Sequence, residues 1–134
     1  LNIKNYDTAD IILTGVSRSG KTPTCLFLAL QYGIYAANYP LIEDDLNTIK
    51  LPSILQKYKN KLFGLTINPV RLQNIRDERR SNSGYASIDQ CRKEVKLAED
   101  IFVQNHVPFI DTSHTSIEEI AGRILNKSKI ERRY

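Results

Sequence analysis

The chain has 134 residues, of which 41% are hydrophobic and 25% are charged, as in one soluble globular domain. Because no apolar run approaches the roughly 20 residues that span a bilayer, we expect no membrane association. The chain starts at Leu1 and contains no methionine, which favours a part of a longer protein. The cysteines Cys25 and Cys91 lack the spacing of metal or redox motifs, and no basic and apolar leader opens the chain, so we expect a reduced, cytoplasmic protein.

The net charge of +4 is concentrated at the C-terminal end of the chain. The last eight residues, KSKIERRY, hold 4 basic and 1 acidic side chains. Residues 1–70 carry 7 basic and 5 acidic side chains, and residues 71–126 carry 8 and 9. This distribution provides no sustained basic face, so the sequence predicts no nucleic-acid partner.

Short apolar strands alternate with amphipathic helices. The β-branched run at 10–14 ends at a glycine and predicts a buried strand, and Ser116 and Glu119 have the spacing of a capping box. In chain order we predict a strand at 10–14, a helix at 24–32, a strand at 34–41, a helix at 51–58, a strand at 61–67, a helix at 69–80, a loop at 82–84, a helix at 87–105, a strand at 107–110 and a helix at 116–127. This alternation predicts an α/β fold in which a parallel sheet is flanked by helices.

Residues 15–22, GVSRSGKT, match the phosphate-binding pattern G-x-x-x-x-G-K-[ST] at every required position. The two glycines permit a sharp turn and a close approach of the backbone to an anion, and the amides between them form a concave nest at a helix N-terminus. Lys21 supplies a mobile positive charge, and the Thr22 hydroxyl can reach a magnesium ion. The predicted nucleotide-binding residues are Gly15, Val16, Ser17, Arg18, Ser19, Gly20, Lys21 and Thr22, with Lys21 also catalytic and Thr22 also a metal ligand.

The strand before this loop and the helix after it are the context that the motif requires, so we predict a fold of the P-loop nucleoside-triphosphate-hydrolase class. We expect residues 1–9 to be a linker, residues 10–126 to form a P-loop nucleotide-binding, kinase-like domain, and residues 127–134 to be a basic tail.

Four arginines are further candidate ligands for anions. Arg18 lies within the loop, and Arg76, Arg79 and Arg80 follow the i, i+3, i+4 spacing that places them on one helix face. Two interpretations remain open for these three. They clamp a transferred phosphoryl group, or they form a solvated face paired with neighbouring acidic residues.

Acidic residues at two places and two histidines are candidates for other roles. We predict that Asp111 is catalytic and is the best candidate for the general base, because it ends a predicted strand, where a carboxylate can hold magnesium indirectly or orient a nucleophile. The alternative, that Asp111 or Ser113 caps the last helix, stays equally open. The cluster at 43–45 forms either a catalytic or metal site or an exposed turn before a helix. We expect a structural role for His106, and a general-base role for His114 stays open.

Three segments together resemble the phosphoenolpyruvate synthase regulatory proteins and the related pyruvate, phosphate dikinase regulatory proteins. These segments are ADIILTGVSRSGKTPTCLFLALQYGIYAANYPLIEDDL, KLFGLTINPVRLQNIRDERRSNSGYAS and PFIDTSHTSIEEIAGRIL. The similarity runs from about Ala9 to the end of the chain. Members of the family are about twice as long, so this chain resembles their C-terminal, nucleotide-binding half.

The resemblance implies a bifunctional enzyme. It implies an ADP-dependent serine/threonine protein kinase that inactivates the synthase by phosphorylating a threonine, and a phosphate-dependent pyrophosphorylase that removes that phosphate. The implied partners are the synthase or the dikinase, ADP, phosphate and pyrophosphate, with Mg²⁺ as an expected cofactor. Two other functions stay open: a small-molecule kinase, and a nucleotide-binding module that is inactive without the N-terminal half.

Overall fold

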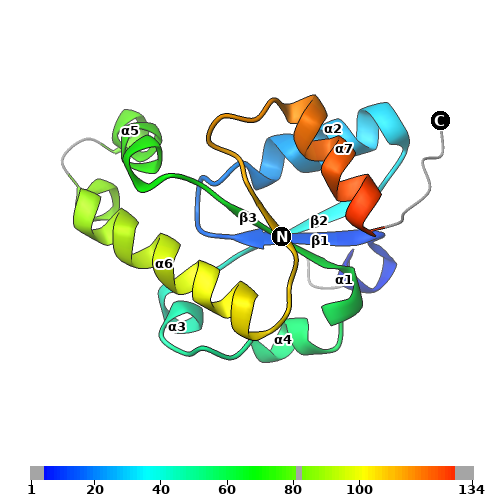
Figure 1. The fold of residues 1–134 in the computed structure, drawn as a ribbon, viewed down its shortest axis with the longest axis horizontal. Coiled ribbons are helices and arrows are strands. Elements are labelled where there is room, and N and C mark those ends of the chain that lie inside the picture. The colour runs from blue at the N-terminus through cyan, green and yellow to red at the C-terminus, as the bar shows by residue number, and fades with distance from the viewer. Residues whose placement is uncertain (1–4, 81–82, 129–134) are drawn as a thin grey trace.

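The computed structural model describes residues 5–80 and 83–128, and within them it confirms the predicted α/β fold. The described strands form one all-parallel sheet in the order β2-β1-β3-β4 (Figure 1). Their bounds are β1 Ile11–Gly15, β2 Ala36–Pro40, β3 Leu62–Thr66 and β4 Phe109–Asp111.

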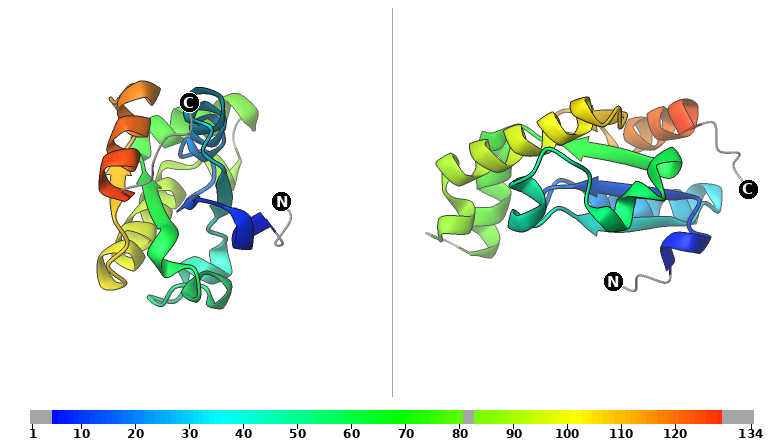
Figure 2. Two further views of the ribbon diagram at one scale, coloured as in Figure 1. Left: turned by 90° about the vertical axis from the view of Figure 1, so that its right-hand side faces the viewer. Right: turned by 90° about the horizontal axis from the view of Figure 1, so that it is seen from below.

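Helices cover both faces of the sheet (Figures 1 and 2). The helices α2 and α7 pack on one face, and α5 and α6, together with the short α1, α3 and α4, pack on the other. The described helices are α1 Asn5–Thr8, α2 Lys21–Tyr32, α3 Glu43–Leu46, α4 Ser53–Gln56, α5 Pro69–Arg79, α6 Ile88–Gln104 and α7 Ile117–Ser128, with 3₁₀ turns η1 Lys59–Lys61 and η2 Gly84–Ala86.

The hydrophobic core is divided into two halves by the sheet. Successive side chains of β1 point to opposite faces, so Ile11 and Leu13 pack with α2 and α7, whereas Ile12 packs with α6. Gly64 in β3 permits the close approach of α6, because a Cβ atom there would lie 2.7 Å from the ring of Phe102. Burial on both faces explains why the two central strands, β1 and β3, are nearly continuous apolar runs.

Several predicted boundaries differ from the structure for local reasons. The helix predicted at 24–32 begins at Lys21, because the last two residues of the phosphate-binding motif, Lys21 and Thr22, already belong to the first turn of α2. The strand predicted at 34–41 begins at Ala36, since the left-handed Gly33 and the bond from Ile34 N to Leu28 O extend the end of α2. The helix predicted at 51–58 is only α4 followed by η1, and the strand predicted at 107–110 is shifted to β4.

Both ends of the predicted domain carry further structure. Residues 5–8, expected within a linker, form α1, and Tyr6 and Ala9 are buried in the core beside α6. The helix α7 extends to Ser128, and the remainder of the expected tail lies outside the described residues, as does position 82 of the expected loop.

The strand order creates a crevice at the carboxyl ends of the two central strands, β1 and β3. The connection after β1 leads to α2 on one face, and the connection after β3, its neighbour, leads to α5 on the other face. In open α/β sheets the divergence of two such connections is where ligands bind, at the carboxyl ends of the strands. The order 2-1-3-4 matches the start of the flavodoxin-like doubly wound arrangement. The P-loop class therefore rests on the loop itself, which occupies this crevice.

Candidate nucleotide-binding site

The loop between β1 and α2 has the backbone of an anion-binding nest. Gly15 packs so closely on β3 that a Cβ atom would lie 2.4 Å from Leu65 O, and Gly20 has a φ of 99°, which favours glycine. Arg18 also has a positive φ, 70°. Alternation of left-handed and right-handed residues turns successive amides toward one side, as in phosphate-binding loops. A left-handed non-glycine residue is strained and is typical of functional loops.

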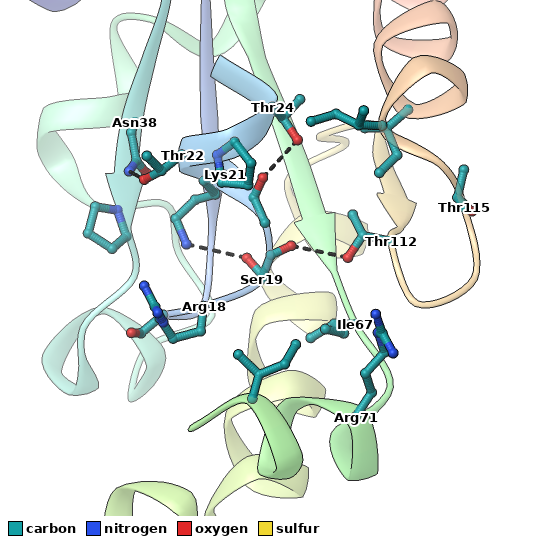
Figure 3. A pocket seen from close by; sticks show the side chains of 17 residues that line it. Arg18, Ser19, Lys21, Thr22, Thr24, Asn38, Ile67, Arg71, Thr112 and Thr115 are labelled. Carbon is teal, nitrogen blue, oxygen red and sulfur yellow. Dashed lines mark hydrogen bonds between the residues drawn. The ribbon is translucent and has the colours of Figure 1, made fainter. Parts of the chain in front are cut away.

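Lys21 is a buried cation at the centre of the loop. Lys21 is 5% exposed, and its Nζ donates to Val16 O at 2.5 Å. The same Nζ donates to Ser19 Oγ at 3.3 Å (Figure 3). Burial lowers the pKa of Lys21 to about 8; the Cys25 thiol partly opposes this, and the guanidinium groups of Arg76 and Arg18 add to it. Among the described residues, no carboxylate forms an ion pair with this ammonium group. An anion bound in the loop would supply the missing negative charge.

A cavity of about 570 Å³ opens beside the loop. Its walls come from the loop, the first turn of α2, the end of β2, the first turns of α5, and the segment from β4 into α7 (Figure 3). The side chains that line it outside the loop include Asn38, Pro40, Ile67, Arg71, Ile75, Thr112, Thr115, Ile117 and Ile120. This size, and the mixture of apolar walls with a few polar groups, are typical of small-molecule sites.

Two threonines connect the loop to the walls of the cavity. The Thr112 Oγ1 lies 3.1 Å from Ser19 O and 3.1 Å from Thr66 O, so it bridges the loop and β3. The Thr24 Oγ1 donates to Gly20 O at 2.7 Å at the start of α2. These bonds fix the backbone of the nest before any ligand arrives.

The residues around Thr22 fit a magnesium ion. The exposed Thr22 hydroxyl accepts a bond from Asn38 Nδ2 at 3.2 Å, while the buried Asn38 Oδ1 has no hydrogen-bond partner. Hydroxyl and amide oxygens are hard ligands, and Mg²⁺ normally binds few protein groups together with phosphate oxygens and water. The described residues contain no cluster of three or more His, Cys, Asp or Glu side chains that could bind a metal without phosphates.

Arg76 supports the loop from outside the cavity and fits neither of its two predicted roles. It is fully buried, its Nη2 donates to Glu94 Oε1 at 2.8 Å and to Ser17 O at 3.1 Å, and its Nη1 donates to Tyr85 O at 2.9 Å. The guanidinium lies 4.2 Å from the Tyr85 ring centroid, and the Tyr85 hydroxyl lies 2.7 Å from Ser17 Oγ. Arg76 is therefore a positioning residue, and only Arg79 and Arg80 have the exposed positions of a solvated face.

The other candidates lie outside the cavity. Asp111 is exposed, and its Oδ1 accepts bonds from Ser113 N at 2.8 Å and Ser113 Oγ at 2.6 Å, which forms a turn after β4. The last helix is capped by Ser116, whose Oγ accepts from Glu119 N, as the predicted capping-box spacing requires. His114 is exposed in the loop before α7.

The acidic segment 43–45 forms α3, and Asp45 Oδ2 accepts from Ile42 N at 3.0 Å, so that carboxylate caps the start of a short helix. His106 is exposed, with a φ of 57° in the turn between α6 and β4. Both segments have local structural roles.

Sequence reasoning missed Asn38, Arg71, Thr112 and the Tyr85–Glu94 support of Arg76. Arg71 and Thr112 reach the cavity only because β3 and β4 follow β1 across the sheet, an order that no local pattern specifies. A signal for Arg76 was present, since it follows the buried Leu72 by four residues and so continues the apolar stripe of α5.

The fold and site define a doubly wound α/β domain with a phosphate-binding type of loop at the crevice of its sheet. Comparison with protein-family models matches residues 1–125 to the kinase/pyrophosphorylase family. The chain belongs to this family. No helix within the described ranges is both long and apolar enough to cross a membrane.

Curated relatives agree with this assignment. The chain is 61% identical over 132 residues to a protein of Pseudoalteromonas translucida (strain TAC 125) named "putative phosphoenolpyruvate synthase regulatory protein". Proteins with the same name from Neisseria gonorrhoeae (strain NCCP11945) and Laribacter hongkongensis (strain HLHK9) are 60% and 59% identical. These alignments cover 98% to 100% of this chain but 48% or 49% of the relatives, so the chain spans about half of their length.

Proposed function

We propose that this chain is the nucleotide-binding part of a bifunctional regulatory enzyme. In one direction the enzyme is an ADP-dependent serine/threonine protein kinase that inactivates phosphoenolpyruvate synthase, or the related dikinase, in the cytoplasm. In the other it is a phosphate-dependent pyrophosphorylase that restores the target. The observation that carries the proposal is Lys21, a buried cation that lies without a carboxylate partner in a nest of backbone amides beside a 570 Å³ cavity. The family and the names of the relatives support it.

The kinase reaction requires a site for a terminal diphosphate. A phosphate-binding loop holds two adjacent phosphates and places its lysine beside the outer one. With ADP bound, that outer phosphate is the β group. The threonine Oγ forms a bond to the β phosphorus, the bond from that phosphorus to the bridging oxygen breaks, AMP leaves, and the hydroxyl proton is released. Lys21 neutralises the charge on the transferred group.

The reverse activity uses the same loop for its product. Pyrophosphate has the two-phosphate shape of the end of ADP, so the loop that holds one holds the other. A magnesium ion at Thr22 and Asn38 would neutralise part of the charge on the bound phosphate oxygens. Thr22 and Asn38 orient each other in the structure, which suits this role.

The experiment is a competition between the two diphosphates. We expect ADP and pyrophosphate to displace each other in isothermal titration calorimetry, and Lys21→Ala to weaken both by roughly a hundredfold, because a positioned cation in a phosphoryl-transfer site contributes on the order of 3 kcal/mol. Independent binding of the two ligands, or a loss of only one of them in Lys21→Ala, would contradict a shared loop.

Asp111 stays a predicted catalytic base. Asp111→Asn keeps a side-chain oxygen for the bond from Ser113 N but removes the base, so a loss of phosphoryl transfer at unchanged ADP affinity would support the role. Unchanged transfer would assign Asp111 to the turn alone.

A second candidate is a binding module without transferase activity of its own. The chain spans about half the length of its relatives, which favours this possibility. ADP binding and phosphorylation of purified synthase should be measured for this chain and for a full-length relative. If the chain binds ADP but modifies nothing while the relative is active, the module describes this chain and the bifunctional enzyme describes the longer protein. Phosphorylation of a metabolite instead would favour a small-molecule kinase.

A further inference from the structure

A second hollow lies beside the phosphate-binding loop. It has a volume of about 480 Å³ and is lined by Ser17, Arg18, Arg79, Arg80 and Tyr85. Ser17 and Arg18 also line the first cavity, so the two hollows share one wall. Neither the position of α5 nor this shared wall was apparent from the loop motif.

The charge of this hollow is entirely positive. Among the residues that the structure describes, five line it, of which three carry guanidinium groups and none carries a carboxylate. Among the described residues, Arg18, Arg79 and Arg80 form no ion pair, in contrast to Arg76, whose charge is compensated by Glu94. Guanidinium groups bind phosphate in a bidentate manner, so three unpaired ones around one hollow are suited to a phosphate dianion.

The shared wall is held rigidly. Ser17 is fixed through its carbonyl by Arg76 at 3.1 Å and through its hydroxyl by Tyr85 at 2.7 Å. The guanidinium carbon of Arg80 lies over the ring of Tyr85, 5.8 Å from the centroid of that ring. Arg18 is held in a left-handed conformation at the turn of the wall. The floor of the hollow is therefore formed in advance, which lowers the entropic cost of binding an anion.

We propose that Arg18, Arg79 and Arg80 form a second phosphate site, distinct from the 570 Å³ cavity, that takes the phosphate dianion of inorganic phosphate or of a phosphorylated side chain. This inference rests on the proposed function for its role. In the phosphate-dependent direction two phosphate groups must lie side by side. An oxygen of hydrogen phosphate forms a bond to the phosphorus of phosphothreonine, the bond from that phosphorus to threonine Oγ breaks, the proton moves to Oγ, and pyrophosphate is formed. The two hollows meet at Ser17 and Arg18, so they provide neighbouring places for both phosphates.

The test is a calorimetric titration of inorganic phosphate into protein saturated with ADP, which occupies the loop. We expect the wild-type chain to bind one phosphate, and Arg79→Gln/Arg80→Gln to weaken that binding at least tenfold while ADP affinity changes less than twofold. The matched control is Arg92→Gln/Lys93→Gln, an exposed pair on α6 that lines neither hollow and removes the same charge. Equal phosphate affinity in the wild type and the Arg79/Arg80 variant, or an equal loss in the control, would overturn the second site.

Two further experiments distinguish inorganic phosphate from phosphothreonine as the ligand, and a failure of the proposed function from a failure of the second site. A blocked phosphothreonine titrated in place of inorganic phosphate shows which of the two occupies the hollow; either supports the site, and binding of neither overturns it. If ADP fails to bind the wild type, the proposed function fails by itself. Inorganic phosphate is then titrated into the ligand-free protein, where a site that is lost in Arg79→Gln/Arg80→Gln but kept in Lys21→Ala still supports the second hollow. Absence of such a site overturns it.

Discussion

Arg76 both pairs with Glu94 in the core and donates to Ser17 O in the loop. Substitutions of this pair can therefore show whether ADP binding depends on the stability of the fold or on the bond that holds the loop. Replacing Arg76 by methionine removes the partner of a carboxylate that is 15% exposed, together with the donors to Ser17 O and Tyr85 O. Removing one member of a buried pair costs about 3–5 kcal/mol. Glu94 keeps the bond from Gln90 Nε2 at 2.8 Å, so we expect a loss of about 3 kcal/mol, at the lower end of that range.

The double variant Arg76→Met/Glu94→Leu removes the stranded charge as well. Because an apolar pair can replace a buried ion pair at little cost, we expect the double variant to regain at least about 1 kcal/mol relative to Arg76→Met. It still lacks the donor to Ser17 O, so its ADP affinity should remain reduced. Glu94→Gln keeps Arg76 in place and should bind ADP within about twofold of the wild type, since its loop is still held.

Urea unfolding followed by circular dichroism measures the stability of all four proteins, and calorimetry measures ADP binding. The reasoning is refuted if the double variant is no more stable than Arg76→Met, because Glu94 would then not have been stranded. It is also refuted if ADP affinity follows stability across the series rather than the presence of Arg76.

Three further predictions concern the packing of β3 on α6, the pKa of Lys21, and the hydrogen bonds of Thr112 to the loop and to β3. Gly64→Ala should reduce the free energy of unfolding by about 1–3 kcal/mol, because the new methyl group meets the ring of Phe102 on α6. Gly122→Ala on the exposed side of α7 should raise that free energy by about 0.5–1 kcal/mol, because it meets nothing and restricts the unfolded chain. Equal effects of the two substitutions in urea titrations would refute the packing argument. Burial lowers the pKa of Lys21 from 10.5 to about 8, so the unfolded chain binds more protons between these values, and stability should rise by up to about 3 kcal/mol as the pH increases through this window. Lys21→Met should flatten that dependence, and an unchanged pH profile of unfolding would show that the ammonium group is not desolvated. Thr112→Val should reduce the free energy of unfolding by about 1–2 kcal/mol and weaken ADP binding several-fold, because it removes the bonds to Ser19 O and Thr66 O. Thr115→Val, whose hydroxyl bond is exposed, should change thermal unfolding little. Equal shifts in the unfolding temperature of the two variants would show that the Thr112 bonds do not hold the loop.

The sequence predicted the order and type of the long elements because their signals are local. The β-branched run of β1, the left-handed Gly33 after α2 and the Ser116 cap of α7 each act within a few residues. The phosphate-binding loop was predictable for the same reason, since its whole geometry lies within residues 15–22. Boundaries shifted where a loop or cap shares residues with the neighbouring helix.

The rest of the site depends on contacts between distant parts of the chain. The sequence places Asp111 and Thr112 side by side, and only the position of β4 beside β3 decides that Thr112 faces the loop while Asp111 closes a turn. Arg76 shares a helix face with Arg79 and Arg80, but the packing of α5 on α6 puts the first in the core and leaves the others exposed. Spacing along one helix cannot specify which residues of a shared face are buried and which are exposed.

The bond between Thr112 and Ser19 joins residues that are 93 positions apart. During synthesis the loop is made well before Thr112, and its wall is complete only when β4 has docked at the edge of the sheet. Such distant pairings form slowly, since chain closure must precede the gain from contact. A ligand that needs the finished wall binds only the completed fold, and by mass action it protects that fold against reopening. A ligand of this cavity would therefore stabilise the docking of β4 at the edge of the sheet as well as the loop that it contacts.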